Sequence, residues 1–475
     1  MRPELLVFMH GEAIGRVVEG RDGACWLTYL PAYTEQRHPI PLSLTAPVGS
    51  GRFDVSVWMD GLLPNRVDLR EYWMRSHGAK SMLPMDLLAT PMGWDCAGAV
   101  QFCREDAASE MLARRPGAEE LSEGDLALHL ESVRRAMPEL PGAPGWVPFS
   151  LAGAQAKTAL IRSGAGWAMP TGGLASTHIL KVALSSFEDN DLVEHVCMSA
   201  LRLCGVAAAR TEIVRAGGER AVAVERFDRR SDAEGKMSRV HQEDVCQALG
   251  FESQDKYQAA LGPSPIDVAE LLDHASSRRA SMALFRDALV CNWLLAAPDA
   301  HAKNYSVLMD GEGYSLGPVY DVCSSAPYSQ PVGDITMAMT VGDAWGVAEA
   351  DDAAAWARCA QDLGLDVEET LHRVEELCEA MPTALTTAVD GLPEGCADSP
   401  AVVGVVDSLV RGRLEQLPQR LARSKDSKSF RKAMATLADG TGSSRPRRTR
   451  CPHYGKRTRR RCVRLFRHNG PHRYH

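Results

Sequence analysis

Three oxygen-bearing side chains near residue 300 constrain this chain more than any other feature of its sequence. Asp299 and Asn304 stand in an Asp-x-x-x-x-Asn spacing, and Asp321 follows them after a predicted β-hairpin. This spacing is typical of a phosphoryl-transfer loop, in which the aspartate accepts the proton of the attacking hydroxyl and the asparagine binds Mg²⁺. A second aspartate then bridges the metal and the phosphates, and Mg²⁺ prefers such oxygen ligands. Because Asp and Asn are common loop residues, the spacing alone is weakly specific.

A lysine and a glutamate upstream provide the phosphate clamp that this chemistry requires. The aliphatic, β-branched run around Lys181 predicts a buried strand. The next segment predicts a helix with its N-cap at Asn190 or Asp191 and with Glu194 in its first turn. In kinases, a strand lysine paired with a helix glutamate holds the α- and β-phosphates of ATP. Taken singly, the lysine also fits a strand end that reaches water, and the glutamate fits a helix dipole.

Two further segments have the features of a nucleotide site. Residues 207–228 read as two strands joined by Gly217 and Gly218, and the second strand runs into Glu225 and Phe227. At this place a two-lobed kinase has its hinge, where backbone groups bind adenine and an aromatic ring packs on the base. Residues 150–158 read as a strand–turn–strand cover for phosphates, although a single glycine makes this segment weak by itself.

Seven sequence blocks in a fixed order resemble the HipA family, the serine/threonine-kinase toxins of bacterial toxin–antitoxin pairs. Between residues 150 and 325 the blocks are SLAGAQAKTAL, THILKV, VEHVCM, VERFDR, HQEDVCQALG, DAHAKNYSVL and LGPVYDVCSS. The strings VWMDGLLPNR and WDCAGAVQ resemble the N-terminal subdomain of the same family. The resemblance extends over about residues 1 to 420. Seven blocks in order are far more specific than any single one of them.

The resemblance implies a role for each candidate residue. Asp299 would be the catalytic base, Asn304 and Asp321 the Mg²⁺ ligands, and Lys181 the phosphate-binding lysine, with Glu194 as its partner. ATP and Mg²⁺ are therefore the expected cofactors. The remaining nucleotide-binding residues implied by the resemblance are Ala154, Gln155, Lys157, Glu225, Phe227, Gln242 and His301.

Ser150 stands where the family carries a self-phosphorylated serine. Its modification would expel the phosphate-covering loop and turn the kinase off. The resemblance also implies a HipB-like helix-turn-helix antitoxin, operator DNA bound through that complex, and a protein substrate such as an aminoacyl-tRNA synthetase.

Two other function classes stay open at this point. A non-catalytic co-repressor would keep the fold and bind DNA with its antitoxin, and loss of Lys181, Asp299 or Asp321 would favour it; all three are present. A small-molecule kinase on the same scaffold is compatible with the Asp-x-x-x-x-Asn spacing. The block around Ser150 and the N-terminal region disfavour that second alternative.

Composition and cysteine usage point to a cytoplasmic protein. With 475 residues, of which 45% are hydrophobic and 24% charged, the chain is long enough for several globular domains. The thirteen cysteines are an odd number without a Cys-x-x-Cys pair, which favours reduced thiols. The apolar run at residues 5–9 is too short for a signal-peptide core or a membrane span, so no membrane association is expected.

These patterns predict an α+β chain with a two-lobed protein-kinase-like core, preceded by a small β-rich module. Strands are expected near residues 4–9, 13–19, 25–29 and 98–103, and helical patterns from Gln242 through Leu295 and in three later segments near 347–363, 366–381 and 398–422. The predicted domains are an N-terminal subdomain (1–105), a helical connector and linker (106–145), a kinase N-lobe (146–228), a helical C-lobe (229–422) and a linker with a basic tail (423–475).

The last 31 residues differ from the rest of the chain. Residues 445–475 hold twelve lysines and arginines and no acidic residue, although the whole chain has a net charge of −8. A flexible basic arm of this kind binds nucleic acid through its phosphates. Zinc binding through Cys451, Cys462, His468 and His472 is the competing reading, but the ten-residue gap between the cysteines is poor geometry for a small finger.

Overall fold

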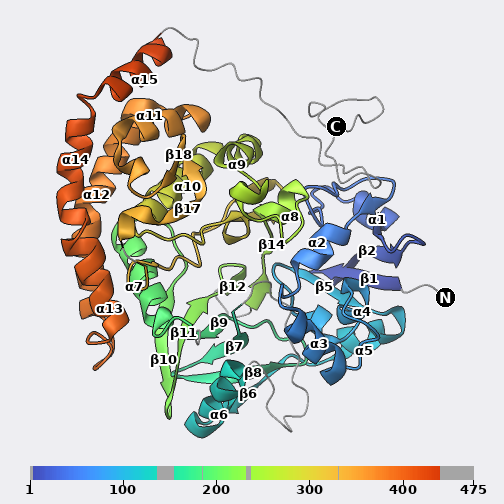
Figure 1. Ribbon diagram of the computed structural model, residues 1–475. Coiled ribbons are helices and arrows are strands. Elements are labelled where there is room, and N and C mark those ends of the chain that lie inside the picture. The colour runs from blue at the N-terminus through green and yellow to red at the C-terminus, as the bar shows by residue number, and fades with distance from the viewer. Residues whose placement is uncertain (1–3, 136–154, 184–185, 232–236, 330, 439–475) are drawn as a thin grey trace.

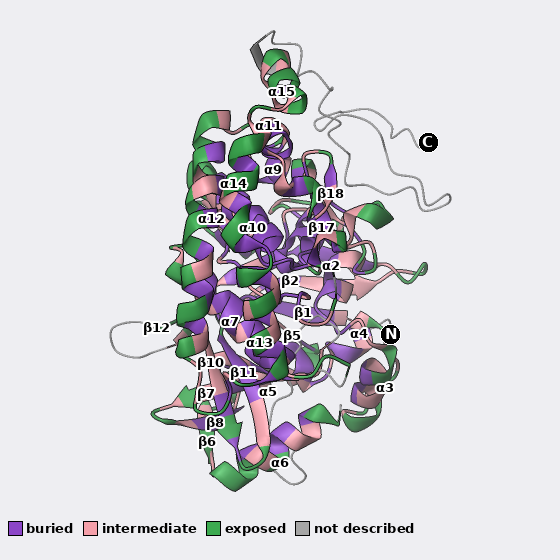
Figure 2. Cartoon of the chain, turned by 60° about the vertical axis from the view of Figure 1, so that its left-hand side comes forward, coloured by how far each residue is buried: buried purple, intermediate pink, exposed green. Residues whose placement is uncertain are grey.

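The chain folds into two lobes with a smaller β-rich module beside them, as expected (Figure 1). The computed structural model describes residues 4–135, 155–183, 186–231, 237–329 and 331–438. The module, the N-lobe and the C-lobe each have their own buried apolar cluster. Figure 2 shows that buried residues concentrate where the three parts meet, while exposed residues lie on the outer helices. No helix among the described residues is long and apolar enough to cross a membrane.

The N-terminal module is an antiparallel sheet covered by short helices. Its strand order is β4-β3-β2-β1-β5. The strands are β1 (Glu4–Met9), β2 (Glu12–Glu19), β3 (Cys25–Tyr29), β4 (Phe53–Asp54) and β5 (Val100–Cys103). The helices are α1 (Pro31–Thr34), α2 (Ser56–Gly61), α3 (Val67–Ser76), α4 (Pro84–Leu87) and α5 (Ala108–Ala113). The four strands predicted for this module are confirmed as β1, β2, β3 and β5. They were predictable because each is a largely apolar run that ends at a turn residue.

The N-lobe is a six-stranded antiparallel sheet with the order β10-β11-β9-β7-β8-β6. Its members are β6 (Gly117–Leu121), β7 (Lys157–Ser163), β8 (Gly166–Thr171), β9 (His178–Val182), β10 (Thr211–Ala216) and β11 (Glu219–Glu225). Two helices, α6 (Glu123–Arg134) and α7 (Asn190–Leu203), pack against this sheet. The prediction that the N-lobe begins at residue 146 is wrong in one respect. β6 lies in the expected connector, yet it pairs along its full length with β8 and forms an edge of the lobe.

The C-lobe is mostly helical and surrounds the central helix α10. Its helices are α8 (Val245–Leu249), α9 (Pro265–Leu272), α10 (Arg278–Leu294), α11 (Ala353–Asp362), α12 (Val367–Asp390), α13 (Pro400–Val405) and α14 (Leu417–Ser424), with a π-helical turn at Val406–Arg411. Trp293 of α10 and Trp356 of α11 are fully buried, with ring centroids 5.1 Å apart. This pairing holds the centre of the lobe together.

Short sheets complete the C-lobe, and β14 (His241–Asp244) and β15 (Ser306–Asp310) contribute residues to the space between the lobes. These two strands form one antiparallel sheet with β16 (Gly313–Leu316), and β17 (Thr336–Val341) pairs with β18 (Ala344–Gly346). A further hairpin, β12 (Arg229–Ser231) and β13 (Met237–Arg239), follows the hinge. The helical pattern expected from Gln242 onward is therefore wrong for the first residues. They form a strand because they pair with β15, and the helix begins only after Asp244, which caps α8.

The segment after residue 423 contains a helix where a polar linker was expected. α15 (Lys428–Ala438) places Phe430, Ala433 and Met434 on one side, at the spacing of an amphipathic helix. Phe430 packs against the core of the C-lobe, and the Ser429 hydroxyl donates to Asp352 at 3.1 Å. The many polar residues of this segment hid its short apolar stripe. The basic tail and its cysteine and histidine residues lie outside the described part of the chain.

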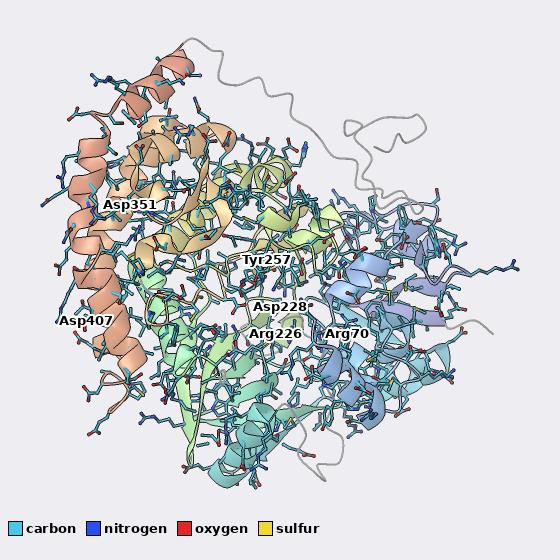
Figure 3. All side chains as sticks on the ribbon, viewed as in Figure 1. Arg70, Arg226, Asp228, Tyr257, Asp351 and Asp407 are labelled. Atoms are coloured by element: carbon cyan, nitrogen blue, oxygen red, sulfur yellow. The ribbon has the colours of Figure 1, made fainter. Side chains whose placement is uncertain are left out.

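A buried ion network joins the N-terminal module to the N-lobe and the segment after it. Asp95 of the module accepts hydrogen bonds from Arg229 at 2.9 Å and from Arg239 at 3.2 Å. Asp228 accepts two hydrogen bonds from the guanidinium of Arg226, at 2.8 and 2.9 Å, and one from the backbone amide of Gly98 at 2.7 Å. Figure 3 places Arg226 and Asp228 in the centre of the molecule. Because the contacts are ionic and buried, the module is an integral part of the folded core.

Candidate active site

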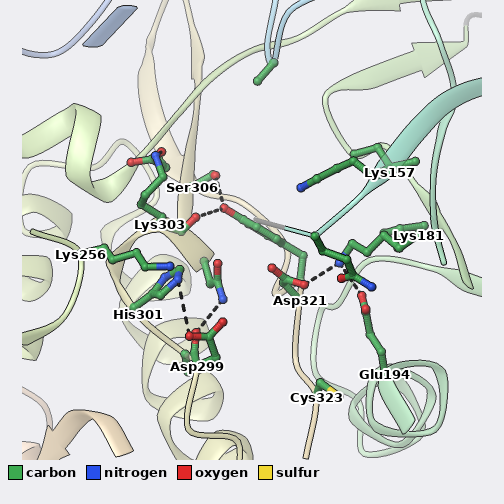
Figure 4. A pocket seen from close by; sticks show the side chains of 18 of the residues that line it. Lys157, Lys181, Glu194, Lys256, Asp299, His301, Lys303, Ser306, Asp321 and Cys323 are labelled. Atoms are coloured by element: carbon green, nitrogen blue, oxygen red, sulfur yellow. Dashed lines mark hydrogen bonds and ion pairs between the residues drawn. The ribbon is translucent and has the colours of Figure 1, made fainter. Parts of the chain in front are cut away.

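A cleft of about 590 Å³ lies between the lobes and collects residues from all three parts of the molecule. Of the thirteen residues predicted for the site, every one within the described ranges lines this cleft: Gln155, Lys157, Lys181, Glu194, Glu225, Phe227, Gln242, Asp299, His301, Asn304 and Asp321. Ala154 and Ser150 lie outside the described residues. Gly61, Leu62 and Asn65 of the N-terminal module add a wall that the sequence did not predict. Figure 4 shows the cleft from close by.

The lysine and glutamate predicted as a phosphate clamp form a buried ion pair. Lys181 on β9 donates to Glu194 on α7 at 2.7 Å and to Asp321 at 2.5 Å (Figure 4). Burial alone would lower the pKa of Lys181, but the two carboxylates outweigh it and raise the pKa above its ordinary value. The lysine is therefore charged and ready to bind an anion.

Asp321 is held ionised by the same cluster. Burial would raise its pKa, but the cations of Lys181 and Lys157 lower it to about 2. Burial raises the pKa of Glu194 in spite of Lys181, so the two carboxylates are not equivalent. Asp321 therefore stays charged more readily than Glu194, and Asp321 is also the more exposed of the two in the cleft.

Lys157 brings a second cation to the upper wall of the cleft. It lies directly opposite Lys181 across the pairing of β7 with β9. Burial and the nearby Lys181 lower the pKa of Lys157 to about 8. Gln155 is held next to it by a 2.8 Å hydrogen bond from its side-chain amide to the Val182 carbonyl. Two cations on neighbouring strands suit a polyanion such as a triphosphate.

The predicted catalytic loop is a tight, well-bonded turn. The backbone amide of His301 donates to the Asp299 carbonyl at 2.8 Å, and the side-chain amide of Asn304 donates to the same carbonyl at 2.7 Å. The Asp299 carboxylate is 64% exposed to the cleft, whereas Asn304 is buried. Both side chains line the same cleft, and most of the carboxylate surface is open to a substrate hydroxyl.

Two residues with left-handed backbone conformation flank this loop. Ala296 has a φ of 47° at the end of α10, and Asp321 has a φ of 61° after β16. The Ser325 amide and hydroxyl both donate to the Ala296 carbonyl, which closes the intervening loop at its base. A left-handed backbone costs a residue with a side chain about 1–2 kcal/mol. Such strain is typical of functional sites, where it fixes the direction of a side chain.

The hinge carries an aromatic ring and a set of buried polar groups. Phe227 packs against Tyr320, with ring centroids 5.4 Å apart. Gln242 donates to Asp228 at 3.2 Å, while its side-chain oxygen is buried in the cleft wall without a partner among the described residues. The ring nitrogen Nδ1 of His301 is likewise buried without a hydrogen-bond partner among the described residues. Buried polar atoms without partners are rare, and here both line a cleft that a ligand would fill.

The donor set fits Mg²⁺. The amide nitrogen of Asn304 is engaged by the Asp299 carbonyl, which leaves the amide oxygen for a cation. Asp321 supplies an ionised carboxylate in the same cleft. A carboxylate, an amide oxygen, phosphate oxygens and water together match the preference of Mg²⁺. The described residues hold no cluster of three or more His, Cys, Asp or Glu that could bind a metal by themselves.

The N-cap of α7 differs from the prediction. Asp189 holds that position, rather than Asn190 or Asp191, and its backbone is left-handed. Its carboxylate makes no capping hydrogen bond because Arg220 and the Ser399 hydroxyl occupy it. Glu194 therefore lies in the second turn of α7 rather than in the predicted first turn, but it still pairs with Lys181 at 2.7 Å.

Sequence reasoning missed two residues in and beside the catalytic loop, Lys303 and Tyr257. Lys303 donates to Asp244 at 2.6 Å, which ties the loop to the start of α8. The Tyr257 hydroxyl donates to the Asp299 carboxylate. Tyr257 is 42 residues from Asp299 along the chain, so no local spacing signals this contact. Lys303 lies inside the predicted loop, directly before Asn304, and this position was the signal that could have identified it.

Comparison with known proteins agrees with this geometry. The sequence family described as HipA-like C-terminal domain matches residues 149–385, and the HipA N-terminal domain matches residues 5–103. A putative kinase, Y4mE of Sinorhizobium fredii, is 31% identical over 422 residues, which are 87% of this chain and 98% of the relative. The serine/threonine-protein kinase toxin HipA of Shewanella oneidensis is 30% identical over 329 residues, covering 66% of this chain and 73% of the relative.

A solved structure shares the fold. A chain in the complex of HipA, HipB and operator DNA from Shewanella oneidensis superposes with a TM-score of 0.72 at 24% identity, covering 87% of this chain and 99% of that chain. Both domains of the family are thus present in order, and two relatives are at least 30% identical over most of their length. The chain belongs to the HipA family.

Proposed function

We propose that this chain is an ATP- and Mg²⁺-dependent serine/threonine protein kinase that acts as the toxin of a toxin–antitoxin pair. The observation that carries the proposal is one cleft that holds Asp299, Asn304 and Asp321 on one side and the Lys181–Glu194 ion pair on the other. Family membership and the kinase names of two relatives support the same reaction class. A non-catalytic co-repressor is disfavoured because the catalytic groups of the described site are all present.

The proposed reaction transfers the γ-phosphoryl group of ATP to a hydroxyl. The serine or threonine oxygen bonds to the γ-phosphorus, the bond from that phosphorus to the β,γ-bridging oxygen breaks, and ADP leaves. The proton of the hydroxyl goes to Asp299, whose exposed carboxylate faces the cleft. Lys181 and Lys157 hold the phosphates, and Asn304 and Asp321 would hold Mg²⁺, which neutralises charge on the phosphate oxygens.

Self-phosphorylation at Ser150 is part of the proposal, although Ser150 lies outside the described residues. Gln155 and Lys157, which follow it in the chain, line the cleft, and Lys157 lies opposite Lys181. A dianion placed a few residues before these groups would compete with the phosphates of ATP for the same cations. We therefore propose that this modification lowers activity.

A HipB-like antitoxin and operator DNA are the proposed partners. The solved relative from Shewanella oneidensis was captured with HipB and its operator DNA, and this chain covers 99% of it with the same fold. In the proposal, sequence-specific DNA recognition belongs to the helix-turn-helix partner. The basic residues of segment 445–475 would add contacts to DNA phosphates.

Asp299→Asn tests the reaction directly. The substitution removes the proton acceptor but keeps the shape of the side chain, so phosphate transfer from labelled ATP should fall by about 10²- to 10⁴-fold. ATP affinity should change little because Lys181 and Asp321 are untouched. Asp390→Asn, at the exposed end of α12, is the matched control. Transfer by the Asp299 variant at the wild-type rate would refute the assignment of the base.

A phosphoproteome recorded after brief induction distinguishes the protein kinase from a small-molecule kinase. We expect new phosphoserine or phosphothreonine sites on one or a few proteins, and none when the Asp299→Asn variant is induced. Growth arrest without any new protein phosphorylation would favour the small-molecule alternative.

A further inference from the structure

The segment from Glu252 to Gly262 forms a support beside the catalytic loop. Its backbone is fixed at two points: the Ala302 amide donates to the Lys256 carbonyl at 3.2 Å, and the Gly262 amide donates to the Tyr257 carbonyl at 2.9 Å. Gly262 passes so close to this turn that a Cβ atom would lie 2.6 Å from the Tyr257 carbonyl oxygen. The turn is therefore compact and depends on glycine at this position.

The side chain after Tyr257 anchors the segment a third time. Gln258 donates to the Thr340 hydroxyl at 3.2 Å and accepts from the Thr340 amide at 2.9 Å. Thr340 belongs to β17, so the segment is fixed to a strand of the C-lobe as well as to the catalytic loop. These contacts fix the backbone on both sides of Tyr257 and so fix the point from which its side chain extends.

Tyr257 is directed at the proposed catalytic base. Its hydroxyl donates a hydrogen bond to Oδ1 of Asp299, and its ring packs edge-on against His301, with centroids 5.1 Å apart. Nε2 of His301 lies 3.8 Å from the same Oδ1 atom (Figure 4). The other carboxylate oxygen, Oδ2, accepts no hydrogen bond from any residue that the structure describes. Within the described part of the chain, the carboxylate therefore has one hydrogen-bonded oxygen and one oxygen without a hydrogen bond.

Tyr257 keeps its proton throughout the ordinary pH range. Burial raises the pKa of its phenol, and the hydrogen bond to Asp299 raises it further. The protonated hydroxyl donates to the Asp299 carboxylate, and this contact can hold the carboxylate in place.

We propose that Tyr257 is a positioning residue for phosphoryl transfer: by fixing Oδ1 of Asp299, it turns Oδ2 towards the acceptor hydroxyl. This inference rests on the proposed function, because it assumes that Asp299 is the base. A carboxylate that is mostly exposed has several accessible rotamers, and a hydrogen bond to one oxygen selects among them. The ring contact with His301 links that choice to the wall of the nucleotide cleft.

A different role for Tyr257 predicts the opposite effect of removing its hydroxyl on the reaction rate. If its hydroxyl merely filled the place of the acceptor hydroxyl in the resting enzyme, it would have to leave before each reaction. Removing the hydroxyl would then speed the reaction. The three backbone and side-chain anchors favour the positioning role, in which removal slows it.

The experiment measures ADP formation from Mg-ATP by the full chain, which counts transfer to a protein hydroxyl and to water alike. Tyr257→Phe removes only the hydroxyl and keeps the ring on His301. We expect kcat to fall by about ten- to a hundredfold, the loss of one hydrogen bond to a charged group, while KM for ATP stays within twofold. Tyr314→Phe is the matched control, because the Tyr314 hydroxyl donates to the Leu271 carbonyl outside the cleft.

A double variant tests whether Tyr257 acts through Asp299. In the Asp299→Asn background, adding Tyr257→Phe should cause no further loss, since the group it positions is already gone. A multiplicative further loss, a kcat that rises, or an unchanged kcat would each overturn the inference. These outcomes are distinct from failure of the proposed function, in which Asp299→Asn alone would leave ADP formation intact.

Discussion

Asp95→Asn is expected to lower the stability of the fold strongly, because Asp95 is a buried carboxylate of the ion network. The Asp95 side chain is 5% exposed and accepts from Arg229, Arg239 and the Ser176 hydroxyl, the last at 2.7 Å. Asparagine keeps the shape but removes the charge, which leaves Arg226 and Arg229 with Asp228 as their remaining close carboxylate. Breaking a buried ion pair by removing one partner costs about 3–5 kcal/mol. The ratio of folded to unfolded protein should fall by about 10²- to 10³-fold or more.

The assay is denaturant unfolding of the full chain, with the midpoint compared at constant slope. The control is Asp106→Asn, which removes the carboxylate of an exposed Arg104–Asp106 pair joined by two hydrogen bonds. We expect no measurable shift for that control, because solvent screens the pair. Equal shifts for the two variants would refute the reasoning, since the burial of the network would then contribute nothing.

The same network sets a pH dependence. Burial would raise the pKa of Asp95, but Arg229, Arg226 and Arg239 outweigh it and lower the pKa to about 2. A carboxylate whose pKa is depressed on folding stabilises the protein above its unfolded pKa, about 3.9, and loses that contribution as the pH falls towards the folded value. The difference in stability between wild type and Asp95→Asn should therefore be constant above about pH 5 and shrink between pH 4 and 2.

Three further predictions concern the nucleotide site. Asp321→Asn should weaken ATP binding measured with Mg²⁺ but not without metal; an equal loss in both conditions would contradict the ligand role. Lys157 has a pKa of about 8 in the ligand-free cleft, so ATP binding near pH 9 should take up a proton, detected by calorimetry in buffers of different ionisation enthalpy. Lys157→Arg should abolish that uptake. Protein incubated with Mg-ATP should carry phosphate on Ser150 by mass spectrometry, and phosphate found only at other residues would defeat the proposed switch.

The candidate site was predictable from sequence where its chemistry is local. Asp299 and Asn304 lie in one turn, and Lys181 lies in an apolar strand whose partner helix follows directly, so spacing and periodicity brought them together correctly. Tyr257 was not predictable in this way. Its contact with Asp299 depends on how a turn anchored to β17 sits on the catalytic loop, and no pattern within either segment encodes that contact.

For the fold as well, features encoded by local sequence were predictable, whereas pairings between distant segments were not. Four of the five strands of the N-terminal module were predicted, because each is a short run bounded by turn residues; the two-residue strand β4 is too short to give such a pattern. The placement of β6 was not predictable, because its exposed, acidic sequence has no strand pattern and its pairing with β8 spans about 50 residues. In α15, the apolar stripe of Phe430, Ala433 and Met434 was present in the sequence but outnumbered by polar neighbours.

The left-handed residues that flank the catalytic loop separate what is good for stability from what is good for the reaction. Glycine is the residue that adopts such a backbone without steric cost, so replacing either Ala296 or Asp321 with glycine should relieve local strain. At position 296 this change would be harmless, because no proposed catalytic group is lost. At position 321 it would remove the carboxylate that faces Lys181. Selection for heat resistance alone would therefore favour glycine at both positions, although the change at position 321 would inactivate the proposed kinase.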